Sequence, residues 1–140
     1  MQLQKKREQY NFYAIVQKGC NKMATIMLCD DAAFMRLTLK KIVEGAGHKV
    51  IAESQNGNEA VENYEIYRPE IVLMDITMPE KDGIAAVKEI KQFDPSATII
   101  MVSAMGQQDK VFAAIAAGAR DFVVKPFEAQ KIVDCIKKYV

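Results

Sequence analysis

The sequence predicts an α/β fold in which helices cover both faces of a parallel sheet. The first observation is that five short apolar, strand-like runs recur after Met23, and each is followed by a segment with helical periodicity. The second is that Gly45, Gly47, Pro69 and Pro95 stand between these segments, where helices end and turns begin. Strands that alternate with helices in this way pair in parallel through right-handed crossovers.

Each predicted element can be placed along the chain by its pattern. The strand-like runs begin near Thr25 (TIMLC), Lys49 (KVIAES), Ile71 (IVLM), Thr98 (TIIMV) and Asp121 (DFVV). The helical segments are marked by apolar residues at helical spacing, such as Phe34, Leu37 and Ile42; Ala60, Val61 and Tyr64; Ile84, Val87 and Ile90; and Ile132, Val133 and Ile136. For a single five-stranded domain this favours the strand order 2-1-3-4-5, the flavodoxin-like (βα)5 arrangement.

Length and composition fit one folded domain and exclude several functions. The chain has 140 residues, of which 50% are apolar, and its formal net charge of +1 predicts no strong attraction to nucleic acids or membranes. No apolar run approaches the about 20 residues that a membrane span needs. The three cysteines form no CxxC pair, which favours a reducing, cytoplasmic environment.

Residues 1–22 are expected to stand apart from the folded domain, which we place at 23–140. The segment is basic, and its short apolar stretch is interrupted by Gln17 and Lys18, unlike a secretory signal. We interpret it as an N-terminal extension that is disordered or not native. The alternative is a basic arm that contacts a partner, the membrane or the acidic remainder of the chain.

Polar residues gather where the predicted strands end. These strand ends carry Asp30 and Asp31, then Asp75, Ser103 and Lys125. A sheet of the predicted order brings the four ends together at its carboxyl edge, next to the switch point. Three adjacent carboxylates repel one another unless a cation binds, and oxygen ligands of this kind suit Mg²⁺. An anion beside Asp75 would lie between the metal and the Lys125 ammonium, which describes a site for a phosphoryl group carried on aspartate.

Each acid also has an ordinary structural explanation. A single aspartate after a strand is most often a helix N-cap, and Asp31 is such a candidate. That explanation does not account for three acids together with a hydroxyl and an ammonium on neighbouring strand ends. We interpret Glu80 and Asp82 as solvated charges of the turn before Gly83. Cys29 is interpreted as a buried strand residue rather than a reactive thiol.

Four stretches in a fixed order resemble the receiver domain of bacterial two-component response regulators. They are LCDDAAFMR, IVLMDITMPEKDG, MVSAMG and GARDFVVKPF, and the resemblance covers nearly all of residues 24–140. MDITMPE and SAMGQQ are similar to stretches in the stand-alone chemotaxis members of the family from Gram-positive-type bacteria. The resemblance implies a phosphorylation-dependent signalling switch that catalyses its own phosphorylation and dephosphorylation, and not an enzyme acting on other substrates.

The resemblance implies a role for each residue at the strand ends. Asp75 would accept the phosphoryl group, and Lys125 and Ser103 would contact its oxygens. Thr77 and Met105 would flank the group and tune its lifetime. The implied Mg²⁺ ligands are Asp30, Asp31, Asp75 and the backbone carbonyl of Thr77. The peptide bond before Pro126 would be cis, which only X-Pro bonds adopt at modest cost.

The resemblance also implies an output surface on the helix after Ser103, the last strand and the last helix. The implied switch and output residues are Phe122, Ala104, Val111, Ile115 and Val124. Phe122 would move inward as Ser103 closes on the phosphoryl group; the alternative is a static core residue. Independently, KVFAAIAAGAR has two apolar stripes where a surface helix needs one, although alanine-rich helices tolerate extra apolar residues. These stripes are Phe112, Ala116 and Ala119, and Val111, Ile115 and Gly118.

The resemblance implies two partners, a histidine kinase and the flagellar motor switch protein, and it is compatible with a phosphatase as a third. It also implies that the protein is a monomer. The alternative is a single-domain phosphorelay carrier that passes its phosphoryl group to a histidine phosphotransfer protein. A phosphatase of the haloacid-dehalogenase type is disfavoured, because Thr77 stands where that class has an acid. A nucleotide-binding role is disfavoured, because no glycine-rich loop follows the first strand.

Overall fold

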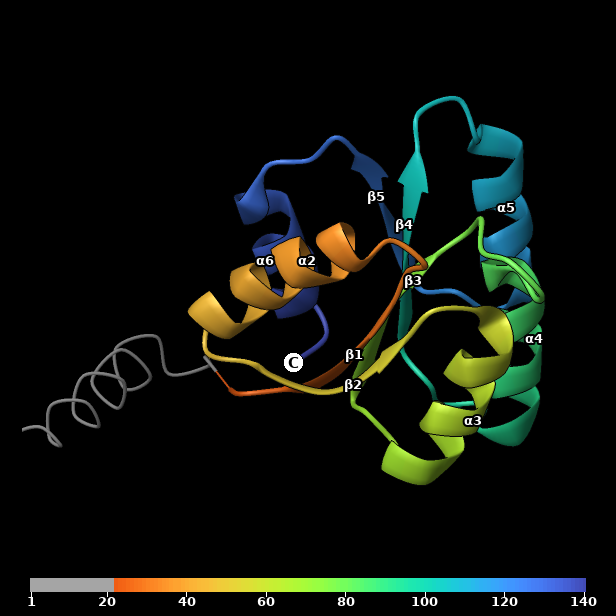
Figure 1. Ribbon diagram of the computed structural model, residues 1–140, viewed down its shortest axis with the longest axis horizontal. Helices are drawn as coiled ribbons and strands as arrows, with labels where there is room; N and C mark the ends of the chain where they lie inside the picture. The colour runs from red at the N-terminus through yellow and green to blue at the C-terminus, as the bar shows by residue number, and fades with distance from the viewer. Residues whose placement is uncertain (1–21) are drawn as a thin grey trace, which may run out of the picture.

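The computed structural model describes residues 22–140, in which five strands alternate with five helices (Figure 1). The strands are β1 (Thr25–Cys29), β2 (Lys49–Ser54), β3 (Ile71–Asp75), β4 (Ile99–Ala104) and β5 (Asp121–Lys125). The helices are α2 (Ala33–Gly45), α3 (Gly57–Tyr67), α4 (Gly83–Phe93), α5 (Gln108–Ala117) and α6 (Ala129–Lys137). The predicted N-terminal extension lies outside the described residues apart from its last residue. None of the helices in 22–140 is long and apolar enough to span a bilayer.

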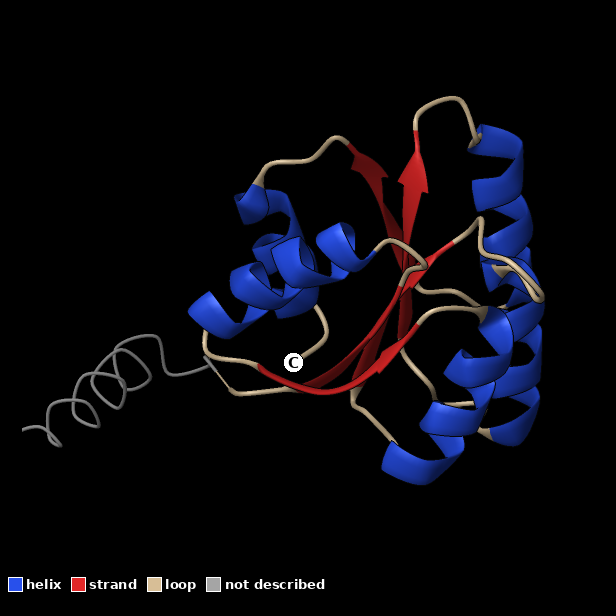
Figure 2. Cartoon of the chain, in the orientation of Figure 1, coloured by secondary structure: helices blue, strands red, loops and turns tan. Residues whose placement is uncertain are grey.

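The five strands form one parallel sheet in the predicted order β2-β1-β3-β4-β5. Helices α2 and α6 cover one face, and α3, α4 and α5 cover the other (Figure 2). Strand β3 lies in the middle, and all its residues are buried, Asp75 included. A parallel strand covered on both faces needs a continuous apolar run, which explains why IVLM precedes this aspartate.

Alternate strand residues enter two separate cores, one under each layer of helices. Met27 and Val72 pack toward α3, α4 and α5, whereas Leu28 and Leu73 pack toward α2 and α6. This alternation follows from the two-residue period of a strand. Because all five strands are parallel, their carboxyl ends lie at one edge of the sheet, and the strand-end residues emerge there.

Helix α2 buries a different stripe from the one that its pattern suggested. Phe34 and Leu37 face solvent, with 77% and 50% of their surface exposed, while Leu39 and Val43 are buried. Ile42 is partly buried against the same core. Both sets of residues have helical spacing, so periodicity alone does not decide which stripe faces the sheet.

Helices α3 and α4 are joined by a polar contact as well as by packing. The Tyr64 hydroxyl donates a hydrogen bond of 2.7 Å to Asp94, just after α4. The Tyr64 ring meets Phe93 edge-on, with ring centroids 6.5 Å apart. The Arg68 guanidinium lies over the Phe93 ring, 4.5 Å from its centre.

Side-chain contacts also hold the amino edge of the sheet, opposite the predicted site. The Thr25 N–H donates to Glu70 Oε1 at 2.8 Å, and the Glu70 N–H donates to the Thr25 hydroxyl at 3.0 Å. His48 is 9% exposed, and its Nδ1 accepts a hydrogen bond of 3.1 Å from the Ala24 N–H. The two edges of the sheet are thus held by different groups of residues.

Candidate functional site at the carboxyl edge

The structure brings three aspartates together at the ends of β1 and β3. One carboxylate oxygen from each of Asp30, Asp31 and Asp75 lies within 4.8 Å of the other two. Asp30 and Asp75 are buried, with 2% and 8% of their surface exposed, and Asp31 is exposed. In the β1–β3 ladder, Cys29 pairs with Met74, so the residues that follow them emerge side by side.

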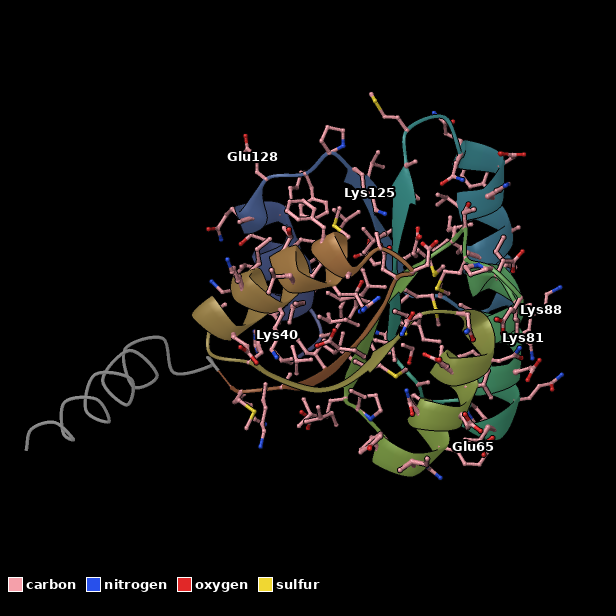
Figure 3. All side chains as sticks on the ribbon, in the orientation of Figure 1. Lys40, Glu65, Lys81, Lys88, Lys125 and Glu128 are labelled. Atoms are coloured by element: carbon pink, nitrogen blue, oxygen red, sulfur yellow. The ribbon has the colours of Figure 1, made fainter. Side chains whose placement is uncertain are left out.

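Lys125 reaches these carboxylates from β5. Its Nζ lies 3.2 Å from Asp30 Oδ2 and 3.5 Å from Asp75 Oδ1. Figure 3 shows Lys125 at the carboxyl end of its strand. The peptide bond between Lys125 and Pro126 is cis, as the resemblance implied. One ammonium therefore contacts two of the three acids.

The charges of these groups leave Asp75 in an unfavourable setting. Burial, and then the negative charge of Asp30, raise the pKa of Asp75 to about 6, although Lys125 opposes this effect. A single lysine does not balance three carboxylates. Three carboxylate oxygens within this distance fit a small, hard divalent cation such as Mg²⁺. Thr77 lies two residues after Asp75, and its carbonyl stays a predicted ligand.

Ser103 lies in β4, beside the end of β3. The β3–β4 ladder pairs Asp75 with Val102, so Ser103 is the next residue along the neighbouring strand. Its side chain is fully buried, and among the described residues its hydroxyl has no hydrogen-bond partner. Buried hydroxyls nearly always have a partner, because they lose their bonds to water. A ligand with oxygen atoms beside Asp75 would supply the missing partner.

The loop that follows Asp75 returns to it, so that Gly83 packs against the main chain of Asp75 and Ile76. The Gly83 N–H donates to the Ile76 carbonyl at 2.7 Å, and a Cβ at position 83 would lie 2.1 Å from the Asp75 carbonyl oxygen. The interpretation of Asp82 as a solvated turn charge is incomplete. It is exposed, but it is also the N-cap of α4, where its Oδ1 accepts a 2.9 Å hydrogen bond from the Ala85 N–H.

Asp31 is not the N-cap of helix α2. The N-cap of α2 is Ala32, without a side-chain capping bond. Asp30 contacts this residue instead, with Oδ1 accepting a 2.9 Å hydrogen bond from the Ala32 N–H. The Arg36 guanidinium also donates to the Asp30 carbonyl at 2.7 Å. Asp30 is therefore held by several contacts, whereas Asp31 is exposed.

Cys29, just before the cluster, behaves as predicted. It is 1% exposed, and burial raises the pKa of its thiol far above the ordinary value. A thiol held in this neutral form is a poor nucleophile. Cys29 is a core residue of β1.

Apolar side chains are exposed on α5 and β5, close to Ser103. Phe122 and Val124 on β5 are 43% and 37% exposed, and Met105, after β4, is 71% exposed. Ala104 is exposed as well. A cavity of about 160 Å³ lies between β4, α5 and β5, and both Ser103 and Phe122 line it.

The exposed stripe of α5 differs from both predicted stripes. Val111, predicted as an output residue, is 5% exposed and belongs to the core together with Ala114. The exposed large residues are Phe112 and Ile115, at 72% and 40%. With small residues on every side of this helix, composition does not show which stripe faces the sheet.

Gln107 is the site residue that sequence reasoning missed. Its Oε1 accepts a hydrogen bond of 2.9 Å from the Ala104 N–H, and its Nε2 donates to Thr77 Oγ1 at 3.1 Å. The carboxamide thus links the end of β4 to the loop after Asp75. Only its place at the start of a predicted helix, three residues after Ala104, could have drawn attention to it.

The fold and the strand-end groups together define a receiver: paired acids after β1, an aspartate ending β3, a hydroxyl on β4 and a lysine ending β5. Residues 26–137 match the response regulator receiver domain, and the chain belongs to this family. It is 57% identical to the chemotaxis protein CheY of Bacillus subtilis over 113 residues, which cover 81% of this chain and 94% of that protein. Identity to CheY of Thermotoga maritima is 55%, with the same coverage.

Solved structures agree with this assignment. The response regulator domain of Thermotoga maritima CheB has a TM-score of 0.79 and 31% identity, covering 84% of this chain and 96% of that one. A chain of the CheX–CheY–BeF3–Mg²⁺ complex from Borrelia burgdorferi has a TM-score of 0.78 and 34% identity, covering 81% and 87%. The predicted resemblance is confirmed: this is the receiver domain of a CheY-like chemotaxis response regulator, a signalling switch.

Proposed function

We propose that the protein accepts a phosphoryl group on Asp75 in the presence of Mg²⁺ and thereby switches its output surface. The observation that carries this proposal is the buried Asp75 carboxylate, 3.5 Å from Lys125 Nζ and beside two further aspartates. Next to it, the buried Ser103 hydroxyl has no partner among the described residues. These groups supply a nucleophile, a positive charge and a hydrogen-bond donor around one point.

The phosphoryl donor is the phosphohistidine of a histidine kinase, or a small acyl phosphate. An Asp75 carboxylate oxygen attacks the phosphorus as the bond to the leaving group breaks. The leaving imidazole or carboxylate keeps the electron pair of that bond, and the imidazole takes up a proton. The residues that would hold Mg²⁺ are Asp30, Asp31, Asp75 and the Thr77 carbonyl. When bound, this ion neutralises negative charge on the phosphoryl oxygens.

The remaining groups position the phosphoryl oxygens and control hydrolysis. Lys125 pairs with one phosphoryl oxygen. In doing so, its ammonium exchanges its present contacts with Asp30 and Asp75 for a contact with the new anion. The Ser103 hydroxyl donates to another oxygen and so gains the partner that it lacks. Water later attacks the phosphorus and releases phosphate from Asp75. Thr77 and Met105 flank this path, so their size and polarity set the lifetime of the phosphorylated form.

The output surface that we propose consists of the exposed apolar side chains on α5, β5 and the β4–α5 loop. Its members are Met105, Phe112, Ile115, Phe122 and Val124. Ser103 and Phe122 line one cavity, so movement of Ser103 toward the phosphoryl group alters the space into which Phe122 packs. The similarity to chemotaxis proteins supports a chemotaxis histidine kinase as donor and the flagellar motor switch protein as target.

Intact-mass spectrometry tests the acceptor. The protein is incubated with acetyl phosphate and Mg²⁺, and one phosphoryl group is expected on the wild type. Asp75→Asn should take up none, and chelation of Mg²⁺ should abolish uptake by the wild type. The control is Asp134→Asn on α6, an exposed acid that is not a member of the three-aspartate cluster, and it should behave as the wild type. Equal uptake by Asp75→Asn would disprove the assignment.

Fluorescence anisotropy tests the output. A labelled peptide from the flagellar motor switch protein is titrated with the protein, with and without BeF3⁻ and Mg²⁺ as a phosphoryl mimic. Binding should tighten about tenfold or more with the mimic, since coupling energies of this kind are common in switches. Unchanged peptide affinity, together with phosphoryl transfer to a histidine phosphotransfer protein, would instead support the phosphorelay carrier.

A further inference from the structure

Gln107 joins the two loops that border the phosphoryl position. Its side-chain Oε1 accepts a hydrogen bond of 2.9 Å from the Ala104 N–H, and its Nε2 donates one of 3.1 Å to the Thr77 hydroxyl. Both polar ends of one carboxamide are therefore used, one on each side. Thr77 follows Asp75 by two residues, and Ala104 directly follows Ser103.

The side chain does not serve its own helix. Gln107 occupies the N-cap position of α5, where a polar side chain commonly accepts a hydrogen bond from the first turn, but it makes no capping bond. The preceding Gly106 has a φ of 85°, a left-handed conformation that glycine adopts without strain. This turn leads the chain from β4 back to the site before α5 begins.

Gln107 competes with a phosphoryl group for the Ala104 N–H. A group on Asp75 has several anionic oxygens, which need donors beyond Lys125 and the Ser103 hydroxyl. The Ala104 N–H is the next main-chain donor along β4, and it donates to the carboxamide oxygen of Gln107. A backbone N–H donates one good hydrogen bond, so an incoming anion and Gln107 cannot both receive it at full strength.

We propose that Gln107 is a latch: its carboxamide bridge between Ala104 and Thr77 holds the unphosphorylated form, and it must open when an anion occupies Asp75. This inference rests on the proposed function, since it concerns the same phosphoryl site. Gln107 is thus a positioning residue that sets how readily the site is filled. Its removal favours the filled state by the free energy of the lost bridge.

Titration with BeF3⁻ in the presence of Mg²⁺ tests the latch. Binding is followed by the ¹⁵N–¹H NMR signal of Ala104 in the full chain. Gln107→Leu has nearly the same size but cannot bridge, and it should bind BeF3⁻ about three- to tenfold more tightly, the ratio expected for losing one net hydrogen bond. Its rate of phosphorylation by acetyl phosphate should rise by a similar factor. Gln108→Leu, an exposed neighbour, is the matched control and should change neither.

A double-mutant cycle with Thr77→Val separates a bridge from a general effect on folding. Because the bridge needs both partners, Gln107→Leu should have a smaller effect in the Thr77→Val background. Thermal unfolding verifies that each variant folds. Unchanged or weaker BeF3⁻ binding by Gln107→Leu, or full additivity in the cycle, would overturn the latch. Failure of the proposed function would be seen separately, as no phosphoryl uptake by the wild type in the mass experiment.

Discussion

Gly83 lies against the main chain of Asp75 so closely that no other residue fits: an added Cβ would be 2.1 Å from the Asp75 carbonyl oxygen. Because Gly83 is the first residue of α4, this contact places the start of that helix against the end of β3, the strand that carries the aspartate. The geometry of the acidic cluster therefore depends on a residue without a side chain. The loop that holds Thr77 lies between these two residues and is shaped by their contact.

Gly83→Ala should consequently disturb both stability and the metal site. The methyl group must push the loop away from Asp75, which we expect to destabilise the protein by about 1–3 kcal/mol. Mg²⁺ affinity measured by calorimetry should fall as the loop moves. Gly45→Ala is the control, since its Cβ would meet nothing within 4 Å, and helix propensity should make it neutral or slightly stabilising. Equal unfolding free energies for the wild type and Gly83→Ala would contradict the argument.

Asp75→Asn should stabilise the metal-free protein at neutral pH. The raised pKa of Asp75 means that its ionisation is less favourable in the folded than in the unfolded chain, and asparagine does not ionise. We expect a gain of about 1–3 kcal/mol in urea unfolding without Mg²⁺. Adding Mg²⁺ should stabilise the wild type and narrow or reverse this difference. Loss of stability in the metal-free variant would argue against repulsion within the cluster.

His48, the single histidine of the chain, should make the protein less stable in mild acid. Burial lowers the pKa of His48 below its ordinary value, and its Nδ1 accepts the Ala24 N–H, so the folded state favours neutral imidazole. Its contribution is therefore full above a pH of 6.5 and is lost as the pH falls toward the folded-state pKa. His48→Asn retains an acceptor without titrating. Between about pH 7 and pH 5, the stability of the wild type should fall more steeply than that of the variant.

Tyr64→Phe should weaken the packing of α3 on α4. It removes the 2.7 Å hydrogen bond to Asp94 and keeps the ring beside Phe93, so we expect a loss of about 1 kcal/mol in unfolding free energy. Tyr67 lies on the same helix and is 50% exposed, which makes Tyr67→Phe a matched control with little expected effect. Equal stabilities of the two variants would show that the Asp94 contact contributes nothing.

The position of Asp75 was predictable because it ends the fully buried strand β3, and those of Ser103 and Lys125 because they lie at or next to the carboxyl ends of β4 and β5. A fully covered parallel strand needs an unbroken apolar run, so the run and its polar end are both visible in the sequence. The strand order then brings the ends together. That part of the prediction used the two-residue and 3.6-residue periods, the crossover rule and the strand order typical of a single five-stranded domain.

Three other features depend on information that such patterns lack. The choice between Phe34 and Leu39 on α2, and the burial of Val111 on α5, depend on how each helix is rotated about its own axis. Two apolar stripes on one helix leave that rotation open. The Gln107 bridge depends on a left-handed turn at Gly106 and on side-chain torsions, which no periodicity encodes.

The reciprocal Thr25–Glu70 hydrogen bonds and the buried His48 lie at the edge of the sheet away from the acidic cluster. Substitutions at that edge are therefore expected to raise or lower the melting temperature without changing the proposed phosphorylation of Asp75. Stabilising substitutions can therefore be introduced at the amino edge. A biosensor built on this chain would carry its reporter at the carboxyl edge and its stabilising changes at the amino edge.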